Sequence, residues 1–493
     1  MSDPCRLHPV TIIFQTLRLV KELFFMLIFV FISLVSTGVS HKFLLLVITL
    51  TGVAIMLIIA GSVLYWWRFI YYVKDGELRI EYGILIRKRR YIPTERIQSI
   101  NLTAGIIHRL LGLTKVEIDT ATSSEHAEAT LAAVELSEAK KLQALLSAGQ
   151  PETDTGHQHT STADFSRPES GVHYHLPVKD LLIAASTSGS FGVLFSILLA
   201  VISPIDKLFP SLNLFDLLTD FVQSNLTLIL YLVPLIALVS WLAAIIYTAV
   251  KYANFTLVRR DTDVYVSYGL LERREFTIPL RRIQAIRITE NPLRQLFGLT
   301  TVYIECAGYG KEYGGSRMLY PLLRRRDLES FLQAVAPHDW ELDTHRPGQL
   351  GIRPVPSRAL FRYQLRLCLP VFLVVIPAVI WLPYGFLALL ILGLASMLAY
   401  WQYKDAGWIT SGPLLVLRSR FLSKVTMLIP QRCVQSAHVN RSFFQRRRKL
   451  ASIGVRVLSG FDGAFFSVRD VDAPDGEALL DWCKPKRASS EDH

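Results

Sequence analysis

Charged side chains are scarce in this sequence. Asp, Glu, Lys and Arg make up 19% of its 493 residues, whereas 51% are hydrophobic. This balance excludes a disordered chain and an ordinary soluble globule. Cysteine is also scarce, and the five cysteines match no disulfide or zinc spacing, which predicts reduced, structural thiols. The composition therefore favours a membrane protein with a substantial soluble part.

Motifs for catalysis are lacking as well. The sequence has no Gly-x-Ser-x-Gly, no His-Glu-x-x-His and no paired carboxylates in an apolar setting. We therefore predict a protein that is not an enzyme, with no catalytic residue, no cofactor and no metal. The pairs His157/His159 and His173/His175 have donors that suit zinc, but they lie in a polar linker that we expect to be disordered. The glycine-rich stretch 308–315 lacks the Gly-Lys-Ser/Thr of a phosphate loop, which favours a hairpin loop.

Six uncharged apolar stretches are each long enough to cross a bilayer as a helix, and they fall into three pairs. Transporters that use ionisable groups within the membrane usually carry at least one charged residue in a span. None lies in these stretches, which disfavours a proton-coupled carrier. The stretches cover 23–40 and 43–67, 181–203 and 226–250, and two spans within 367–403.

The placement of Lys and Arg predicts the topology. Of the 53 Lys and Arg residues, only Lys42 and Lys207 lie in the short connections within the pairs. A pair of spans returns the chain to its starting side, so the N-terminus and the three long segments share one side. The positive-inside bias makes that side the cytoplasm. The net charge of +12 then follows from topology and needs no nucleic acid to explain it.

Three copies of one soluble unit follow the three pairs. The string that starts at Ile92 (IPTERIQSI) recurs at Ile278 (IPLRRIQAI) and at Ile429 (IPQRCVQSA). Such a period indicates a repeat architecture. The predicted parts are an N-terminal segment with helix pair 1 (1–67), unit 1 (68–147), a polar linker (148–180), helix pair 2 (181–250), unit 2 (251–335), a linker (336–366), helix pair 3 (367–403), and unit 3 with the tail (404–493).

Each unit is predicted to be mainly β-structure. Asp75-Gly76 between alternating runs predicts a hairpin, and Ser411-Gly412 takes its place in unit 3. The repeated proline suits a strand edge or bend, and 291–298 has the pattern of a short helical turn closed by glycine. A helical pattern ends each unit. The predicted fold class is an α+β membrane protein with six transmembrane helices in three pairs, each followed by a bent antiparallel sheet capped by a helix. Three equal repeats suggest a pseudo-threefold ring.

The repeated motifs resemble those of the bacterial pleckstrin-homology-like (PH) domain family of membrane proteins. These motifs are a Tyr-Gly-Leu/Ile turn at Tyr82 and Tyr268, the Ile-Pro-x-x-Arg-Ile-Gln core at Ile92 and Ile278, and a Leu-Gly-Leu-Thr segment. The resemblance covers nearly the whole chain and is weaker in unit 3, where Lys449 replaces the glycine.

This resemblance implies a PH-like barrel or sandwich with a C-terminal helix after each helix pair. It also implies a multi-pass protein of the bacterial inner membrane, with the PH-like units in the cytoplasm and no known catalytic activity. A shorter membrane protein with one PH-like domain is the implied partner. Envelope maintenance or stress resistance is the implied setting, although no residue carries it.

Clusters of basic residues are candidate contacts for anionic lipid headgroups or for a partner. Each Lys or Arg near an anionic surface contributes about 1 kcal/mol, so a cluster of four contributes ~4 kcal/mol before screening. The alternative is a solvated face that merely follows the positive-inside bias. The candidates are Arg87, Lys88, Arg89, Arg90, Arg273, Arg274, Arg281, Arg282, Arg446, Arg447, Arg448 and Lys449.

Two functions from different classes are consistent with the sequence. The first is a membrane scaffold or sensor whose three units engage a partner membrane protein, each other or anionic lipid. The second is a transporter or export component for a lipid or toxic amphiphile, because helix pairs can enclose a path without charged residues. Substrate-dependent flux in proteoliposomes would distinguish them.

Overall fold

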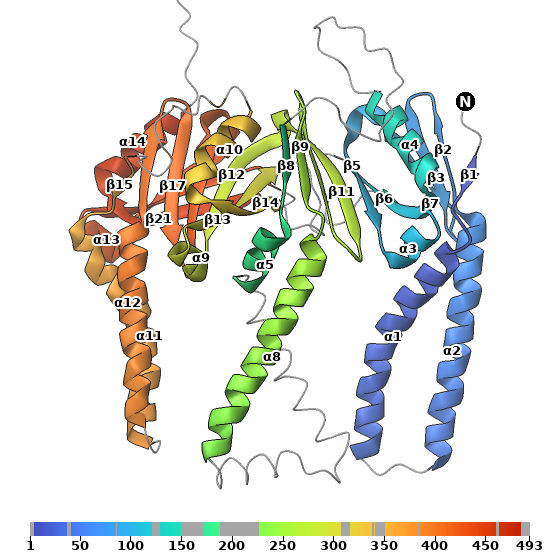
Figure 1. The fold of residues 1–493 in the computed structure, drawn as a ribbon, viewed down its shortest axis with the longest axis horizontal. Helices are drawn as coiled ribbons and strands as arrows, with labels where there is room; N and C mark the ends of the chain where they lie inside the picture. The colour runs from blue at the N-terminus through green and yellow to red at the C-terminus, as the bar shows by residue number, and fades with distance from the viewer. Residues whose placement is uncertain are drawn as a thin grey trace, which may run out of the picture.

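The computed structural model describes residues 4–36, 41–84, 86–120, 129–148, 172–187, 226–306, 316–337, 340, 351–381, 385–459 and 463–484. Three repeats stand side by side, and their long helices leave on one common side (Figure 1). In each repeat, a short strand comes first, the long helices follow, and a β-rich unit ends in a helix.

The order of elements is nearly the same in the three repeats. Repeat 1 contains β1 (Cys5–Arg6), α1 (Thr11–Ser36), α2 (His41–Arg68), β2 (Ile70–Lys74), β3 (Glu77–Tyr82), β4 (Lys88–Pro93), η1 (Thr94–Arg96), β5 (Ile97–Ala104), α3 (Ile106–Leu110), β6 (Leu113–Thr120), β7 (Ala129–Glu135) and α4 (Leu136–Ala148). Repeat 2 contains β8 (Val172–His175), α5 (Val178–Ser186), α8 (Leu226–Tyr252), β9 (Thr256–Arg259), β10 (Asp263–Tyr268), β11 (Arg273–Pro279), η3 (Leu280–Arg282), β12 (Ile283–Glu290), α9 (Pro292–Leu296), β13 (Leu299–Cys306), β14 (Ser316–Arg324), η5 (Arg325–Asp327) and α10 (Leu328–Val335). Repeat 3 contains β15 (Arg353–Pro354), η6 (Ser357–Ala359), α11 (Leu360–Trp381), η7 (Gly385–Leu387), α12 (Ala388–Asp405), β16 (Gly407–Ser411), β17 (Leu414–Arg420), β18 (Lys424–Pro430), η8 (Gln431–Cys433), β19 (Val434–Asn440), α13 (Phe443–Arg447), β20 (Leu450–Val457), β21 (Ala464–Asp472) and α14 (Ala473–Cys483).

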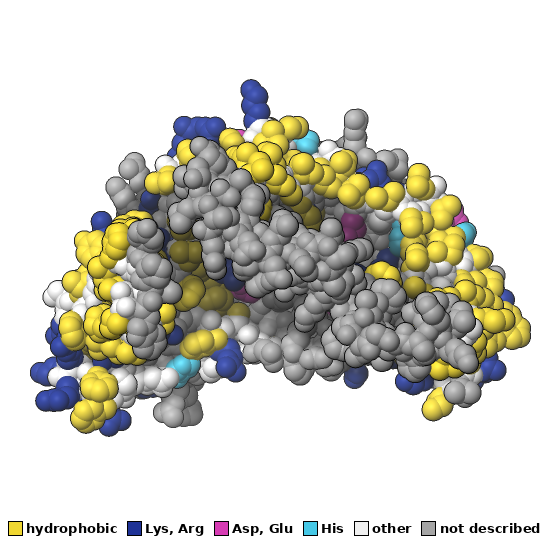
Figure 2. All heavy atoms as spheres, turned by 90° about the horizontal axis from the view of Figure 1, so that it is seen from below, with side chains coloured by type: hydrophobic (Ala, Val, Ile, Leu, Met, Phe, Trp, Pro, Cys, Tyr) yellow, Lys and Arg dark blue, Asp and Glu magenta, His cyan; other side chains and the backbone are white. Residues whose placement is uncertain are grey.

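The long helices are apolar enough to cross a membrane. Within the described residues, four helical stretches meet the criteria of length and composition: Thr49–Arg68, Pro234–Tyr252, Ser357–Ile380 and Gly385–Asp405. Viewed from below, hydrophobic side chains cover the described helices, and Lys and Arg lie around them (Figure 2). These findings identify a membrane protein. Most of the predicted span 181–203 lies outside the described residues.

The hairpins predicted in units 1 and 3 and the helical turn predicted in unit 2 are present. Lys74 pairs with Glu77 across a two-residue turn in which Asp75 and Gly76 have φ of 54° and 73°. Two positive φ values are the signature of a type I′ hairpin, which Asp-Gly favours. In unit 3 the hairpin turn lies one residue later than the predicted Ser411-Gly412: Ser411 pairs with Leu414, and the turn residues are Gly412, with φ of 53°, and Pro413. The helical turn predicted within 291–298 is α9.

Each unit contributes two short antiparallel sheets, and neighbouring units share them edge to edge. In the first junction, β5 of unit 1 pairs with β11 of unit 2, and in the second, β12 of unit 2 pairs with β18 of unit 3. The result is two seven-stranded sheets that run through the junctions, with a four-stranded sheet at one end and a three-stranded sheet at the other.

The units therefore form a row (Figure 1) and not the pseudo-threefold ring suggested by three equal repeats. Within the described residues, β4 and β19 are the outer strands of the two terminal sheets. A ring would require them to meet. The physical reason for the row is that pairing of edge strands joins successive units in one direction. It leaves one strand edge at each end of the row without a neighbouring unit.

Two short strands lie in stretches that the sequence assigned to linkers. The strand β8 lies in the predicted linker 148–180 and pairs with β9, and β15 lies in the linker 336–366 and pairs with β16. Likewise β1 pairs with β2. The chain thus adds a strand to each unit before it enters the helices, so the strands before and after the helices of each repeat belong to the same sheet.

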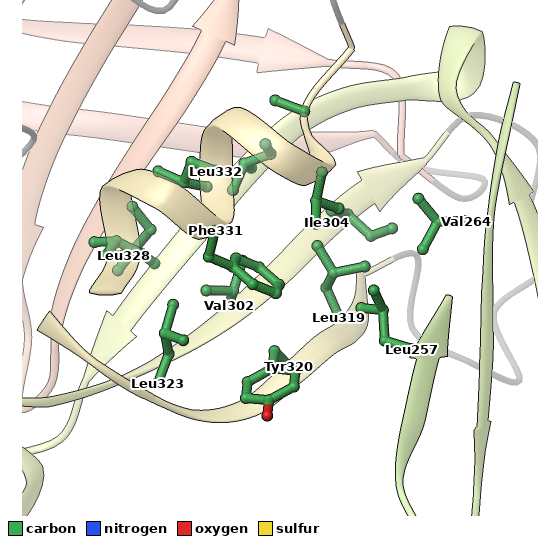
Figure 3. Packing of buried hydrophobic residues seen from close by; sticks show 14 of the residues in the cluster. Leu257, Val264, Val302, Ile304, Leu319, Tyr320, Leu323, Leu328, Phe331 and Leu332 are labelled. Carbon is green, nitrogen blue, oxygen red and sulfur yellow. The ribbon is translucent and has the colours of Figure 1, made fainter. Parts of the chain in front are cut away.

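The core of each unit lies between its sheets and its closing helix. In unit 2, Leu328, Phe331 and Leu332 on α10 point toward Val302 and other residues of β13 and β14 (Figure 3). The repeat of apolar residues at helical spacing orients this face. Each closing helix therefore caps its sandwich, as the sequence predicted.

Candidate membrane-facing site

Each unit holds a turn against the end of the long helix that precedes it. We call these the tip turns: they join β3 to β4, β10 to β11, and β17 to β18. In unit 1 the Arg68 guanidinium donates to the Ile84 carbonyl at 2.9 Å, and in unit 3 the Gln402 amide donates to the Phe421 carbonyl at 2.9 Å. In unit 2 the Leu270 amide donates to the carbonyl of Val250 at 3.0 Å. All three turns therefore lie where a helix enters its unit.

Glycine gives the tip turns of units 1 and 2 their shape. Gly83 and Gly269 have φ of 115° and 110°. A Cβ at Gly269 would lie 2.0 Å from the carbonyl oxygen of Glu272. Only glycine adopts this conformation without strain. The Tyr-Gly motif seen in the sequence is thus a requirement of the turn.

The tip turns expose large apolar side chains. Ile86, Leu271 and Phe421 are 73%, 50% and 85% exposed. Isolated apolar residues on a surface are ordinary, but the same exposure at the same place in three units is a pattern. It would bury apolar area if the turns met the interfacial layer of a bilayer.

A second exposed element, the short helix after the fifth strand of each unit, lies at the same end (Figure 1). Its apolar side chains also point outward. Those more than 40% exposed are Ile106, Ile107, Leu110 and Leu111 in unit 1, Leu293, Leu296 and Phe297 in unit 2, and Phe443 and Phe444 in unit 3. Lys449 has φ of 52°, close to Gly112 and Gly298 at the same place. Unit 3 thus keeps this geometry without the glycine.

One side chain in each short helix connects it to the first helix of its repeat. In unit 1 the His108 ring stacks on Phe14 with centroids 4.1 Å apart. In unit 2 the buried Arg294 donates to the Ala184 carbonyl at 3.0 Å and to the Thr187 hydroxyl at 3.2 Å, both in or just after α5. Burial lowers the pKa of Arg294.

In unit 3 this connection is an ion-pair network. Asp470, which is fully buried, accepts from Arg362 at 2.7 Å and from Arg366 at 2.6 Å, both near the start of α11. The amide of Gln445 on α13 donates to the same carboxylate at 2.8 Å. Three different kinds of contact thus fix each short helix to the first helix of its repeat.

Most of the predicted basic clusters flank these exposed elements. Arg87 and Lys88 to Arg90 follow the first tip turn, Arg273 and Arg274 follow the second, and Arg446 to Lys449 lie on and after α13. Several are paired with acids: Arg87 and Arg89 with Glu81, Arg273 with Glu275 at 2.7 Å, and Arg274 with Glu272 at 3.0 Å.

Arg281 and Arg282 lie elsewhere. They follow β11, whereas Arg273 begins it, and a seven-residue strand spans about 20 Å. They therefore lie at the end of unit 2 that faces away from the long helices. Arg282 also reaches across the first junction, where its guanidinium donates to the Ile97 carbonyl at 3.5 Å.

One hollow beside the second short helix combines basic and apolar side chains. It has a volume of about 660 Å³ and lies between α5, α9 and the end of β14. Arg324, Arg325 and Arg326 line it together with Phe297 and Asp180. A phosphate group accepts hydrogen bonds from guanidinium groups, and an acyl chain packs on an aromatic ring. The hollow thus suits the headgroup region of an anionic lipid.

Buried polar groups fix the junctions between units. At the second junction Lys424 and Glu290 form a buried ion pair at 3.0 Å, and burial lowers the pKa of Lys424 while Glu290 opposes this. The Glu305 carboxylate accepts from the Ser459 hydroxyl at 2.7 Å, and burial raises its pKa. At the first junction burial likewise raises the pKa of Asp119.

The remaining predictions from the sequence concern thiols and metals. All five cysteines are free thiols, as predicted, and burial raises the pKa of Cys306 to about 12. In the part of the chain that the structure describes, no three His, Cys, Asp or Glu side chains gather as metal ligands. The His175 ring donates from Nδ1 to the Phe255 carbonyl at 3.0 Å, whereas His157, His159 and the stretch 308–315 lie outside the described residues.

Comparison with known proteins agrees with the threefold repeat. The model of the bacterial PH domain matches the chain three times, at residues 24–150, 209–337 and 371–487. The chain belongs to the bacterial PH domain family. It is similar to the UPF0699 transmembrane protein YdbT of Bacillus subtilis (strain 168), with 32% identity over 497 residues and 99% of each chain covered. No solved structure matches it.

Sequence reasoning found the basic clusters of these bacterial PH units but missed the apolar tips. Ile86, Leu271 and Phe421 are the same residue types that fill the core, so composition gives no sign of their exposure. A signal was present nevertheless: each follows the Tyr-Gly turn or its equivalent and precedes a basic residue within three positions. An apolar residue at a turn, beside Lys or Arg, is typical of an interfacial anchor.

Proposed function

We propose that this bacterial PH domain protein is a non-enzymatic membrane scaffold or sensor whose three units contact the bilayer surface with their tip turns and short helices. Six transmembrane helices in three pairs would place the N-terminus and all three units in the cytoplasm of the bacterial inner membrane. The observation that supports this most directly is the recurrence of exposed apolar side chains in all three units, where the helices enter.

The energetic argument combines two modest terms. Full burial of a Leu or Phe side chain stabilises by about 1.5–3 kcal/mol, and partial insertion at an interface gives less. A Lys or Arg beside an anionic surface adds about 1 kcal/mol, reduced by salt and by acids such as Glu81. Because the three units belong to one chain, their contributions to membrane binding add up. The row of units would therefore have a defined orientation on the bilayer.

The same contacts would give the platform a sensory role. Each short helix is fixed to the first helix of its repeat, and each tip turn to the last helix that precedes its unit. A change of bilayer thickness or headgroup charge that moves a long helix would therefore move the sheet attached to it. A partner membrane protein and a role in envelope maintenance or stress resistance are part of this proposal.

Immersion of the tips can be measured on the full chain in lipid nanodiscs. A spin label at Phe421→Cys tests the site, and a label at Arg281→Cys, at the opposite end of a unit, is the matched control. The half-buried Cys5, Cys368 and Cys483 would be replaced by Ser, whereas Cys306 and Cys433 are buried and react slowly.

We expect the label at position 421 to collide with oxygen, which partitions into lipid, more than with a water-soluble nickel chelate. The label at position 281 should show the reverse. Immersion at 421 should be deeper in anionic than in neutral nanodiscs, and the difference should fade with salt. Equal accessibility at both positions would refute contact of the tip turns with the bilayer. Equal depth in anionic and neutral nanodiscs would refute a contribution from contacts with anionic headgroups.

A further inference from the structure

The two internal junctions use the same strands in the same register. In repeat numbering, Ala104, Glu290 and Arg441 each lie twelve residues after the first Ile of the Ile-Pro motif. Opposite them, Arg273 faces Ala104 in the first junction, and Lys424 faces Glu290 in the second. Arg273 and Lys424 are themselves equivalent, each five residues before that Ile. One rule of pairing therefore builds both junctions.

Each end of the row has one of the two strands that form such a junction, without a partner unit beside it. The third strand of unit 1, β4, is equivalent to β11 and β18, and in the described residues it pairs only with β3. Its residues Lys88 to Tyr91 are all exposed, whereas β18, covered by β12, is almost entirely buried. At the other end β19, equivalent to β5 and β12, pairs only with β20 within the described part.

The charges at the two ends do not match each other. Applying the register of the junctions to β19 and β4 sets Arg441 opposite Arg87, and Asn440 opposite Lys88. The internal junctions carry buried carboxylates at Asp119 and Glu305, and the equivalent residue of unit 3 is the exposed Arg456. Like charges directly opposite one another destabilise a pair of strands. Both ends are thus basic at the positions where the second junction pairs opposite charges.

We propose that the free edge of β4 is a docking site for an antiparallel strand of another PH-like unit that carries an acidic side chain opposite Arg87. The second junction shows this chemistry at the equivalent position, where Glu290 meets Lys424 at 3.0 Å. Main-chain hydrogen bonds supply the affinity of such β-augmentation, and the charge selects the partner. The basic end at β19 keeps a second copy of this chain from taking the site.

This inference rests on the scaffold role of the proposed function and names the chemistry of its partner. The two are separable, because label immersion at Phe421 tests membrane contact without any partner. The chain itself supplies the probe for the docking site: its own β19 edge, made acidic by Arg441→Glu, which then carries a carboxylate to Arg87 of a second copy.

The experiment measures self-association of the full chain in nanodiscs that hold two copies, and in detergent by sedimentation. We expect the wild type to stay monomeric, and Arg441→Glu to associate at least tenfold more tightly. The control Arg441→Gln should associate less than Arg441→Glu. Since Arg441 also pairs with Glu477 at 2.6 Å, Asn440→Glu, which faces Lys88, serves as a second variant. Adding Arg87→Glu to Arg441→Glu should abolish association.

A disulfide test fixes the register. Ala437→Cys and Tyr91→Cys face each other in the transferred register, where opposed Cα atoms lie about 4.5–5.5 Å apart, within reach of a disulfide. In the Arg441→Glu background these two should cross-link between copies, and Ser436→Cys with Tyr91→Cys should not. Association of the wild type would overturn the proposal. So would monomeric Arg441→Glu and Asn440→Glu variants, association that survives Arg87→Glu, or cross-linking in the shifted register.

Discussion

Breaking the ion pair at the second junction should open the sheet that joins units 2 and 3. The side chains of Lys424 and Glu290 are 8% and 9% exposed and lie 3.0 Å apart. Removing one partner of a buried pair leaves an uncompensated charge and costs about 3–5 kcal/mol. We therefore expect Lys424→Met to destabilise the junction by ~3 kcal/mol or more. Lys424→Met combined with Glu290→Leu should lie close to the wild type, because apolar side chains of similar size replace a buried pair with little loss.

Native-state hydrogen exchange of β12 and β18 gives the measurement. A loss of 3 kcal/mol corresponds to roughly a 100-fold fall in amide protection. The matched control is Lys484→Met, whose partner Asp481 is at 2.7 Å but whose pair is 73% and 70% exposed, so the expected change is below ~1 kcal/mol. The reasoning is refuted if Lys424→Met leaves protection within threefold of the wild type, or if the double variant is as open as the single one.

Three further predictions concern the short helix, the first junction and a tip turn. Arg294→Met should destabilise the contact between α5 and α9 by about 1–3 kcal/mol, because the Ala184 and Pro321 carbonyls lose a buried donor. Faster hydrogen exchange of the amides in α5 and α9 should report this loss. Since burial raises the pKa of Asp119, its folded form binds a proton before the unfolded form does, so wild-type stability relative to Asp119→Asn should rise as the pH falls from 7 to 4.5. Gly269→Ala should destabilise its tip turn by about 1–3 kcal/mol, because φ is 110° and the added Cβ meets the Glu272 carbonyl, and a thermal shift would report it.

Each of these has a control and a contradicting result. Arg294→Lys should fail to restore amide protection in α5 and α9, because one ammonium group cannot replace the coplanar N–H donors of a guanidinium group. Full restoration of protection would contradict this. A constant difference between wild type and Asp119→Asn across the pH range would contradict the linkage. Gly393→Ala, where a Cβ meets nothing within 4 Å, is the control for Gly269→Ala, and equal effects would contradict the role of the turn.

The local structure of this protein follows from local sequence. Asp75-Gly76 determined a hairpin because only a few residues tolerate two positive φ values, and Gly83 and Gly269 set the tip turns for the same reason. The Ile-Pro motif ended a strand because proline cannot continue a ladder. Uncharged apolar runs determined membrane helices, since backbone groups in a bilayer must bond within their own segment.

The tertiary structure alone decided how the units meet and which apolar residues stay outside. The pairing of β5 with β11 joins strands about 170 residues apart, and no local pattern selects one edge over another. Ile86 and Phe421 have the same hydrophobicity as core residues, so only the fold places them on the surface where the long helices join the units. The physical reason is common to both cases: propensity and periodicity act over a few residues, whereas edge pairing and exposure depend on which surfaces the whole chain leaves uncovered.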